Sequence, residues 1–245
     1  MFSKLSAFAL VALLPAYTHA LVGIDWSIDT IPSTGLKDIT FPINMANAAH
    51  ESGYYHAMQY GFVGLNDIGY TGIQPRPDNS AGQSVVHGVF SSFAAGTTTN
   101  DSQCTPGADG GPGVSCAVEI PSPYADTYNF VVTNTGGTTW AGTMVNTATG
   151  TQTHIGSWTL PSGSGGIQSS QVGFVEYYPW NSGEPPNHCQ MLPKTEVFFG
   201  TPTTKTGVVS LAKLSDAYEY GDCVGQVNFS QVRTADGVSV KVGVA

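Results

Sequence analysis

Residues 139–160 read TWAGTMVNTATGTQTHIGSWTL, and this stretch decides the fold class. Two runs rich in β-branched and aromatic residues flank a turn at 148–150, which predicts a hairpin of two antiparallel strands. Similar runs separated by Gly-rich and Asn-rich turns recur along the chain, and no long stretch shows the helical period. About a dozen strands at short intervals are typical of an all-β antiparallel β-sandwich of jelly-roll type.

The remaining predicted strands lie at 39–47, 55–63, 69–74, 83–93, 115–120, 128–134, 171–180, 195–200, 208–214, 224–232 and 238–244. Two polar segments, 96–113 and 181–194, are predicted as long loops. Because functional residues concentrate on loops and surfaces of rigid scaffolds, both segments are candidates for site formation.

The first twenty residues have the pattern of a secretory signal peptide. Lys4 precedes a short apolar run, and Thr18 and Ala20 place small residues where a signal peptidase reads them. The apolar run is shorter than the ~18 residues that a membrane span needs. We therefore predict a signal peptide at 1–20 and a single β-sandwich domain at 21–245 that is secreted, extracellular, monomeric and not membrane-bound.

The charge balance limits the range of partners. The chain has 8 Lys and Arg residues against 17 Asp and Glu residues, a formal net charge of −9. Phosphate binding needs clustered cations, so nucleic acid is not an expected partner. A densely anionic polymer is also disfavoured, which leaves neutral or weakly acidic glycans.

Four cysteines in an exported chain predict two disulfides. Of the three pairings that four cysteines allow, we favour Cys104–Cys116, which closes a Gly-rich loop, and Cys189–Cys223. No spacing typical of a zinc site is present, so no metal site is predicted.

Two sequons and one Gly-rich loop suggest further surface features. Asn100 and Asn228 begin Asn-x-Ser sequences and are predicted glycosylation sites. The loop GADGGPG at 107–113 lacks the acidic spacing of a calcium loop. We expect no cofactor, with structural calcium as an alternative.

The stretch 51–75 carries a family resemblance. Gly69-Tyr70-Thr71-Gly72-Ile73-Gln74 is similar to the Gly-Tyr-Phe-Gly-Ile-Gln signature of a secreted, mostly bacterial domain family of unknown function, with Thr71 in place of an aromatic residue. The strands QSVVHGVFSSF and VGFVEYYPW resemble later family strands, so the resemblance spans residues 45–205. Members often follow a carbohydrate-binding-like module, which implies an extracellular, polysaccharide-related role but supplies no catalytic residues.

Rings and amides in this stretch suit a sugar, because a pyranose stacks on aromatic rings and its hydroxyls need donors and acceptors. The ligand-binding candidates are Tyr55, Gln59, Tyr70, Gln74, Arg76 and Trp180. Strand alternation predicts that Tyr55, Ala57 and Gln59 share one face, and that the opposite face carries Tyr54, His56, Met58 and Tyr60. Core packing is the competing interpretation for half of these residues.

The catalytic candidates are Glu176, His56 and Tyr178. Glu176 lies between aromatic residues on a predicted strand, an environment in which a carboxyl can act as a general acid. A glycoside hydrolase needs a second carboxylate, for which the candidates are Glu184, Glu196, Glu119 and Asp67. A lyase needs a base and a cation that neutralises the substrate; the candidates are His56, His87, Tyr178 and His188 for the base and Arg76 for the cation.

Three functions follow from these patterns. Recognition of extracellular or cell-wall polysaccharide is the leading hypothesis. A polysaccharide lyase or glycoside hydrolase on the same surface is the first alternative, and a non-catalytic secreted effector or wall structural protein is the second. Two titratable groups that reach one point would favour the enzyme, whereas exposed rings in a shallow groove would favour binding.

Overall fold

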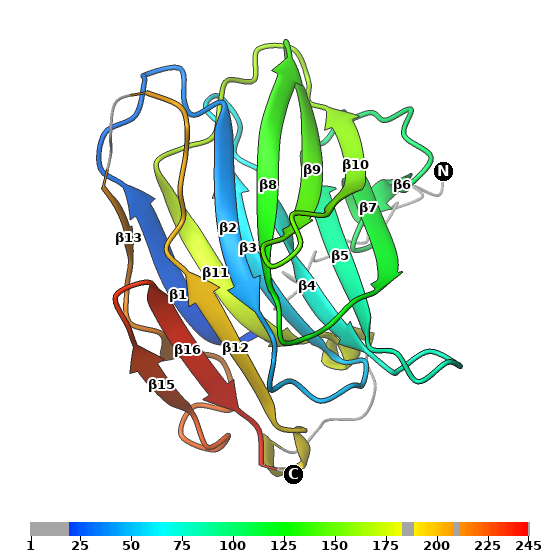
Figure 1. The fold of residues 1–245 in the computed structure, drawn as a ribbon. Coiled ribbons are helices and arrows are strands. Elements are labelled where there is room, and N and C mark those ends of the chain that lie inside the picture. The colour runs from blue at the N-terminus through cyan, green and yellow to red at the C-terminus, as the bar shows by residue number, and fades with distance from the viewer. Residues whose placement is uncertain (1–19, 183–188, 208–210, 245) are drawn as a thin grey trace, which may run out of the picture.

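The structure is a computed structural model that describes residues 20–182, 189–207 and 211–244. Two antiparallel sheets pack face to face (Figure 1). The larger sheet has the order β13 (Ala212–Leu214), β1 (Ala20–Ile28), β11 (Ser170–Tyr177), β3 (Tyr54–Gly61), β4 (Ile68–Arg76), β5 (Val85–Ser92), β7 (Gly111–Pro121) and β6 (Cys104–Ala108), while β14 (Tyr218–Glu219) pairs with β1.

The smaller sheet has the order β10 (Gln152–Thr159), β9 (Thr139–Asn146), β8 (Thr127–Gly136), β2 (Asp38–Asn44), β12 (Thr195–Gly200), β16 (Gly237–Val242) and β15 (Ser230–Arg233). Two short 3-10 helices, η1 (Tyr178–Ser182) and η2 (Cys189–Met191), follow β11. The prediction of an all-β antiparallel sandwich of jelly-roll type with two disulfides is confirmed. Within the described ranges, no helix has the length and apolar character needed to cross a membrane.

The hairpin that decided the fold class forms as predicted, because β9 and β10 pair along their length. Its two tryptophans, Trp140 and Trp158, are fully buried and contact Phe62 at centroid distances of 5.2 and 5.9 Å. Trp158 also stacks on Phe90 of the larger sheet at 4.6 Å. These rings join the two sheets into one hydrophobic core.

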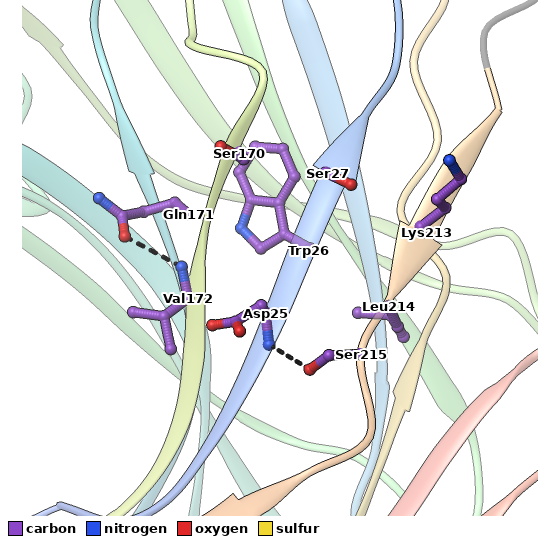
Figure 2. A pocket seen from close by; sticks show the side chains of 9 residues that line it. All are labelled: Asp25, Trp26, Ser27, Ser170, Gln171, Val172, Lys213, Leu214 and Ser215. Carbon is purple, nitrogen blue, oxygen red and sulfur yellow. Dashed lines mark hydrogen bonds between the residues drawn. The ribbon is translucent and has the colours of Figure 1, made fainter.

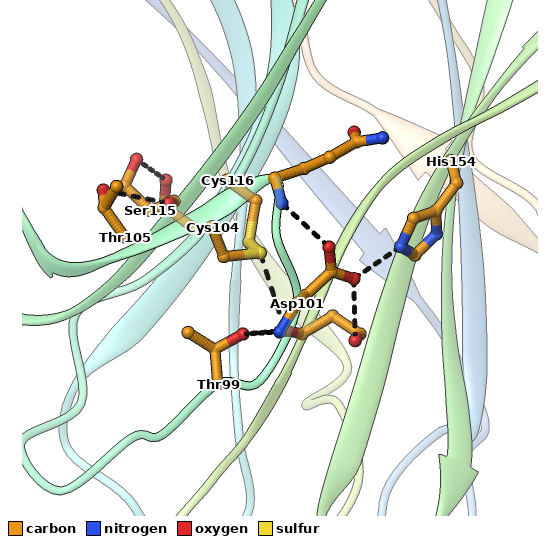
Figure 3. Close-up of a disulfide and its surroundings, with 10 residues drawn as sticks. Thr99, Asp101, Cys104, Thr105, Ser115, Cys116 and His154 are labelled. Carbon is orange, nitrogen blue, oxygen red and sulfur yellow. Dashed lines mark hydrogen bonds and ion pairs between the residues drawn. A yellow bond between two sulfur atoms is a disulfide. The ribbon is translucent and has the colours of Figure 1, made fainter.

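The predicted disulfide pairing is confirmed, with Cys104 bonded to Cys116 and Cys189 bonded to Cys223. Figure 3 shows the first disulfide between β6 and β7. Gly156 of β10 lies against it, and a side chain at that position would collide with both sulfurs. The disulfide therefore packs directly on the smaller sheet. Two disulfides fit a protein that folds in an oxidising, extracellular compartment.

Three elements differ from the sequence prediction. Residues 20–28 form β1, a strand inside the larger sheet that was not predicted. The predicted loop 96–113 contains β6 and the first residues of β7. The predicted strand 224–232 is reduced to its last residues, which begin β15. Part of the predicted strand 208–214, residues 183–188 of loop 181–194 and almost the whole signal segment lie outside the described residues.

Candidate functional site

The larger sheet carries a second apolar cluster on the face that points away from the smaller sheet. This outer-face cluster contains the buried residues Tyr55, Ala57, Tyr70, Val89 and Phe174, with Phe93, Tyr178 and Tyr220 packed against it. The inter-sheet core instead takes Tyr54, Met58 and Tyr60 from β3. The predicted alternation of β3 is therefore confirmed, and the odd-numbered side chains of β3 define an outer face that is itself partly covered.

Strand register lines up a polar row across this outer face. Glu176 of β11 pairs with Tyr55 of β3, and Gln74 of β4 pairs with His87 of β5. The register of β3 and β4 continues to place Gln74 beside Tyr55, and His87 pairs with Glu119 of β7. Directly opposed residues share one face of a sheet. Five strands therefore contribute one row of acidic, phenolic, amide and imidazole groups.

Glu176 is the only acidic side chain that is buried in the described part of the chain, with 8% of its surface exposed. Its surroundings are phenolic. Burial raises the pKa of Tyr55, Tyr70 and Tyr220, and the negative charge of Glu176 raises each of them further. The Tyr55 hydroxyl is buried and has no hydrogen-bond partner among the described atoms. The buried Tyr55 hydroxyl therefore has unused hydrogen-bonding capacity next to Glu176.

Asp109 brings a second carboxylate to the same place. It occupies the tip of the hairpin between β6 and β7 with Gly110, and both residues have positive φ (48° and 75°), as a two-residue turn of type I′ requires. The Tyr70 hydroxyl donates to both Asp109 carboxylate oxygens at 3.2 and 3.1 Å. Burial raises the pKa of Asp109, and the hydrogen bond from Tyr70 opposes that rise. The Tyr70 ring lies 5.1 Å from the Tyr55 ring.

Asp109 was not among the sequence candidates. The dipeptide Asp109-Gly110 is a strong hairpin signal, but it lies within a segment that was predicted as a loop. Recognising the turn would have placed an aspartate at a strand end. Its contact with Tyr70 depends on how the β6–β7 hairpin sits beside β4 and β5, which local sequence does not specify.

Arg76 organises the other end of the row. Its Nε donates to Glu119 at 2.9 Å, its Nη2 donates to Gln74 Oε1 at 2.8 Å and its Nη1 donates to the Tyr178 hydroxyl at 3.3 Å. His87 shares the same Glu119 oxygen at 2.9 Å. The hydrogen bond from Arg76 lowers the pKa of Glu119, and burial together with the Arg76 charge lowers the pKa of His87. Arg76 therefore holds the Gln74 oxygen and leaves the Gln74 amide N–H groups available to a ligand.

Two of the predicted site residues lie elsewhere. His56 is fully buried on the inner face, where its Nε2 lies 3.2 Å from Thr195 Oγ1, and burial lowers its pKa to about 3. It does not share a face with Glu176, so its position does not support a role as a base. Trp180 packs against the inter-sheet core, with its ring 5.7 Å from that of Tyr177, rather than against the outer-face cluster.

Tyr55 and Tyr70 lie on the expected face, but they do not offer rings for stacking. They are 2% and 8% exposed, the Tyr55 hydroxyl is itself buried, and the Tyr70 hydroxyl is bonded to Asp109. Gln59 lies on the same face, paired with Tyr70. The half-buried rings of Phe93, Tyr178 and Tyr220 border the cluster.

The predicted second carboxylates do not meet Glu176. Glu119 lies four strands away along the row, which is about 19 Å at about 4.8 Å per strand and is too far for a glycosidase pair. Glu196 is on the smaller sheet beside Lys241 at 3.1 Å, and Asp67 is exposed in the turn before β4. Glu184 and His188 lie outside the described residues. The described chain contains no cluster of three or more His, Cys, Asp or Glu side chains that could hold a metal ion.

No family model matches this chain. No curated protein matches it either. Among solved structures, scytalido-glutamic peptidase with a peptide-based transition state analogue has a TM-score of 0.49 and 16% identity, over 93% of this chain and 100% of that one. SCP-B, a member of the eqolisin family of peptidases in complex with the tripeptide Ala-Ile-His, has a TM-score of 0.45 and 15% identity, also over 93% and 100%.

A CBM2 module of Lactobacillus casei BL23 phage J-1 evolved Dit has a TM-score of 0.28 and 16% identity, over 62% of this chain and 67% of that one. Shared architecture at such identities accompanies many unrelated functions. The function therefore has to be argued from the residues of the outer face.

Proposed function

We propose that the protein hydrolyses an extracellular polysaccharide on the outer face of the larger sheet, with Glu176 and Asp109 as its two carboxyl groups. One observation carries the proposal. Glu176, the only buried acidic side chain of the described chain, pairs with Tyr55, and Asp109 accepts hydrogen bonds from Tyr70, whose ring lies 5.1 Å from that of Tyr55. Two carboxyl groups beside one pair of tyrosines favour an enzyme over a binding platform.

The chemistry divides between the two carboxyls. Glycoside hydrolysis needs one carboxyl group to protonate the leaving oxygen and a second to activate water or attack the sugar. Glu176, buried among phenols, takes the role of acid. Asp109, at the rim and bonded to the Tyr70 hydroxyl, takes the second role.

The lining supports a sugar as the substrate class. Along the row and next to it, the outer face presents side-chain amides of Gln59 and Gln74, phenol hydroxyls and carboxylates, which match the mixed donors and acceptors of a hydroxyl rim. Non-catalytic recognition is less well supported than turnover, because the Tyr55 and Tyr70 rings are buried and cannot stack on a pyranose.

The test is incubation of the purified protein with β-glucan, xylan and chitin, and with denatured protein, followed by mass spectrometry of the products. We expect oligosaccharides whose mass includes one added water, whereas elimination products would lack it. Glu176→Gln should lower the rate at least about 100-fold, in line with loss of a general acid. Glu196→Gln is the matched control, because Glu196 lies on the smaller sheet, and it should keep the wild-type rate.

Each other outcome changes the conclusion. Wild-type turnover by Glu176→Gln would remove Glu176 from the reaction. Peptides released from denatured protein would keep hydrolysis on this face but replace the substrate class. Retention on a polysaccharide without any product would favour polysaccharide recognition over hydrolysis.

A further inference from the structure

A groove lined by both polar and apolar residues lies on the outer face at the β13 end of the larger sheet (Figure 2). It is open to solvent, has a volume of about 510 Å³ and is lined by β1, β11 and the segment around β13. This volume falls within the roughly 300–1,000 Å³ that small-molecule sites occupy. None of the residues that line it was singled out from the sequence.

Strand alternation places the groove on the same face as Glu176. Trp26 is 1% exposed and points into the core, so its neighbours Asp25 and Ser27 point to the outer face. Ser27 pairs with Ser170 of β11 on one side and with Lys213 of β13 on the other. Ser170 and Glu176 differ by an even number of positions on β11, so the two side chains project from the same face.

A row of paired residues connects the groove to the tyrosine pair. Asp25 pairs with Val172 of β11, and the register of β11 and β3 continues to place Val172 beside Gln59. Gln59 in turn pairs with Tyr70. The row therefore crosses three strand spacings, about 14 Å at about 4.8 Å per strand. One polymer chain of a few sugar residues could cover both places.

The lining of the groove has little free charge. Lys213 Nζ forms an ion pair with Asp29 at 2.8 Å. Asp25 accepts a hydrogen bond from the Tyr218 hydroxyl at 3.1 Å. The hydroxyls of Ser27 and Ser170 add uncharged donors and acceptors. Such a surface suits a ligand with many hydroxyls and no net charge, and it offers no unpaired cation to a uronate or sulfate.

Tyr218 is an aromatic residue next to the groove, bonded to its lining residue Asp25. Its ring covers Gly23 of β1, where any side chain would collide with it, and 42% of its surface is exposed. It lies between Asp25, to which it donates, and Tyr220 of the outer-face cluster, 6.2 Å away between ring centroids. An exposed ring beside hydroxyl and carboxylate groups is the combination that a pyranose stacks on and bonds to.

We propose that this groove is a subsite for a neutral sugar residue of the polysaccharide that is cleaved at Glu176. The inference rests on the proposed function and extends it. It names residues away from the cleaved bond that bind a sugar of the substrate. It also sets a direction: the polymer runs from Glu176 along β11 toward Ser170 and the neighbouring strand β1.

The experiment measures binding without turnover. In the Glu176→Gln background, the affinities for cellohexaose, laminarihexaose, xylohexaose and chitohexaose are measured by isothermal titration calorimetry. Adding Ser170→Trp, which fills the groove, should weaken the binding of the preferred hexasaccharide at least 10-fold and leave the binding of its disaccharide unchanged. Ser80→Trp, in the exposed turn between β4 and β5, is the matched control and should have no effect.

A milder variant protects the test against misfolding. Ser27→Ala with Ser170→Ala removes two hydroxyls without adding bulk, and it should weaken hexasaccharide binding several-fold while the circular dichroism spectrum is unchanged. Equal hexasaccharide affinity in all groove variants would overturn the subsite and leave hydrolysis at Glu176 standing. If no oligosaccharide binds, the subsite is overturned as well, and the product analysis of the wild-type protein then decides separately whether hydrolysis survives.

Discussion

The buried histidine His56 should make the protein less stable in acid. Its ring is fully buried between the sheets, its Nδ1 has no partner among the described atoms, and burial alone lowers its pKa to about 3. In the unfolded chain the same ring has a pKa of about 6.5. Between these two values the unfolded state binds one more proton than the folded state. The stabilisation is therefore fully present above about pH 6.5 and is lost as pH falls toward 3.

The size of the effect follows from the two pKa values. Each pH unit inside this window changes the free energy of unfolding by at most about 1.4 kcal/mol. Lowering the pH from 6.5 to 4.5 should therefore cost about 2 kcal/mol through His56. Other titrating groups also contribute, so the quantity to measure is the difference between the wild type and a variant that cannot titrate at this position.

The assay is urea unfolding, followed by tryptophan fluorescence at pH 6.5 and 4.5, for the wild type and for His56→Gln. The variant should lose about 2 kcal/mol less than the wild type over this interval, whatever its stability at pH 6.5. The His56 ring resonances should show no protonation shift in the folded wild type across the same range. Equal losses in both proteins, or a ring that titrates near pH 6, would refute the reasoning.

Three further outcomes are expected. Replacing Cys189 and Cys223 by alanine removes a cross-link with a sequence separation of 34, and chain entropy gives a loss of about 4 kcal/mol, measurable by chemical unfolding. Tyr70→Phe removes the hydrogen bond to Asp109 and should raise the pKa of Asp109, measured by carboxyl NMR; an unchanged pKa would show that the bond is not formed. Gly72→Ala places a methyl group against the β3 backbone and should cost about 1–3 kcal/mol, seen as a lower Tm.

Most of the sheet structure could be predicted from sequence, because alternation and turn residues act locally. The β9–β10 hairpin and the two faces of β3 follow directly from such patterns. The first strand, β1, was missed because it directly follows the segment interpreted as a signal peptide. β6 was missed because Pro106 and Gly107 are weak strand formers within a short segment.

The site was predictable only in part. Alternation was enough to expect Glu176 on one face with Phe174 and Tyr178. It could not show that Asp109 reaches Tyr70, since that contact joins a hairpin tip to a strand 39 residues away in sequence. It also gave no sign that His56 would lie inside the sandwich. A strand's period separates its two faces but does not say which face is covered by the other sheet.

The position of β1 has a consequence for how the chain folds. The first described strand is held between β11 and β13, so its partners lie about 150 and 190 residues further along the chain. Pairing that spans most of the sequence is entropically costly to initiate, and proteins dominated by it fold in milliseconds to seconds. Until residue 214 has emerged from translation or translocation, β1 has an unpaired edge, and such edges are prone to aggregate. A variant truncated before β13 should therefore be recovered mainly as insoluble material.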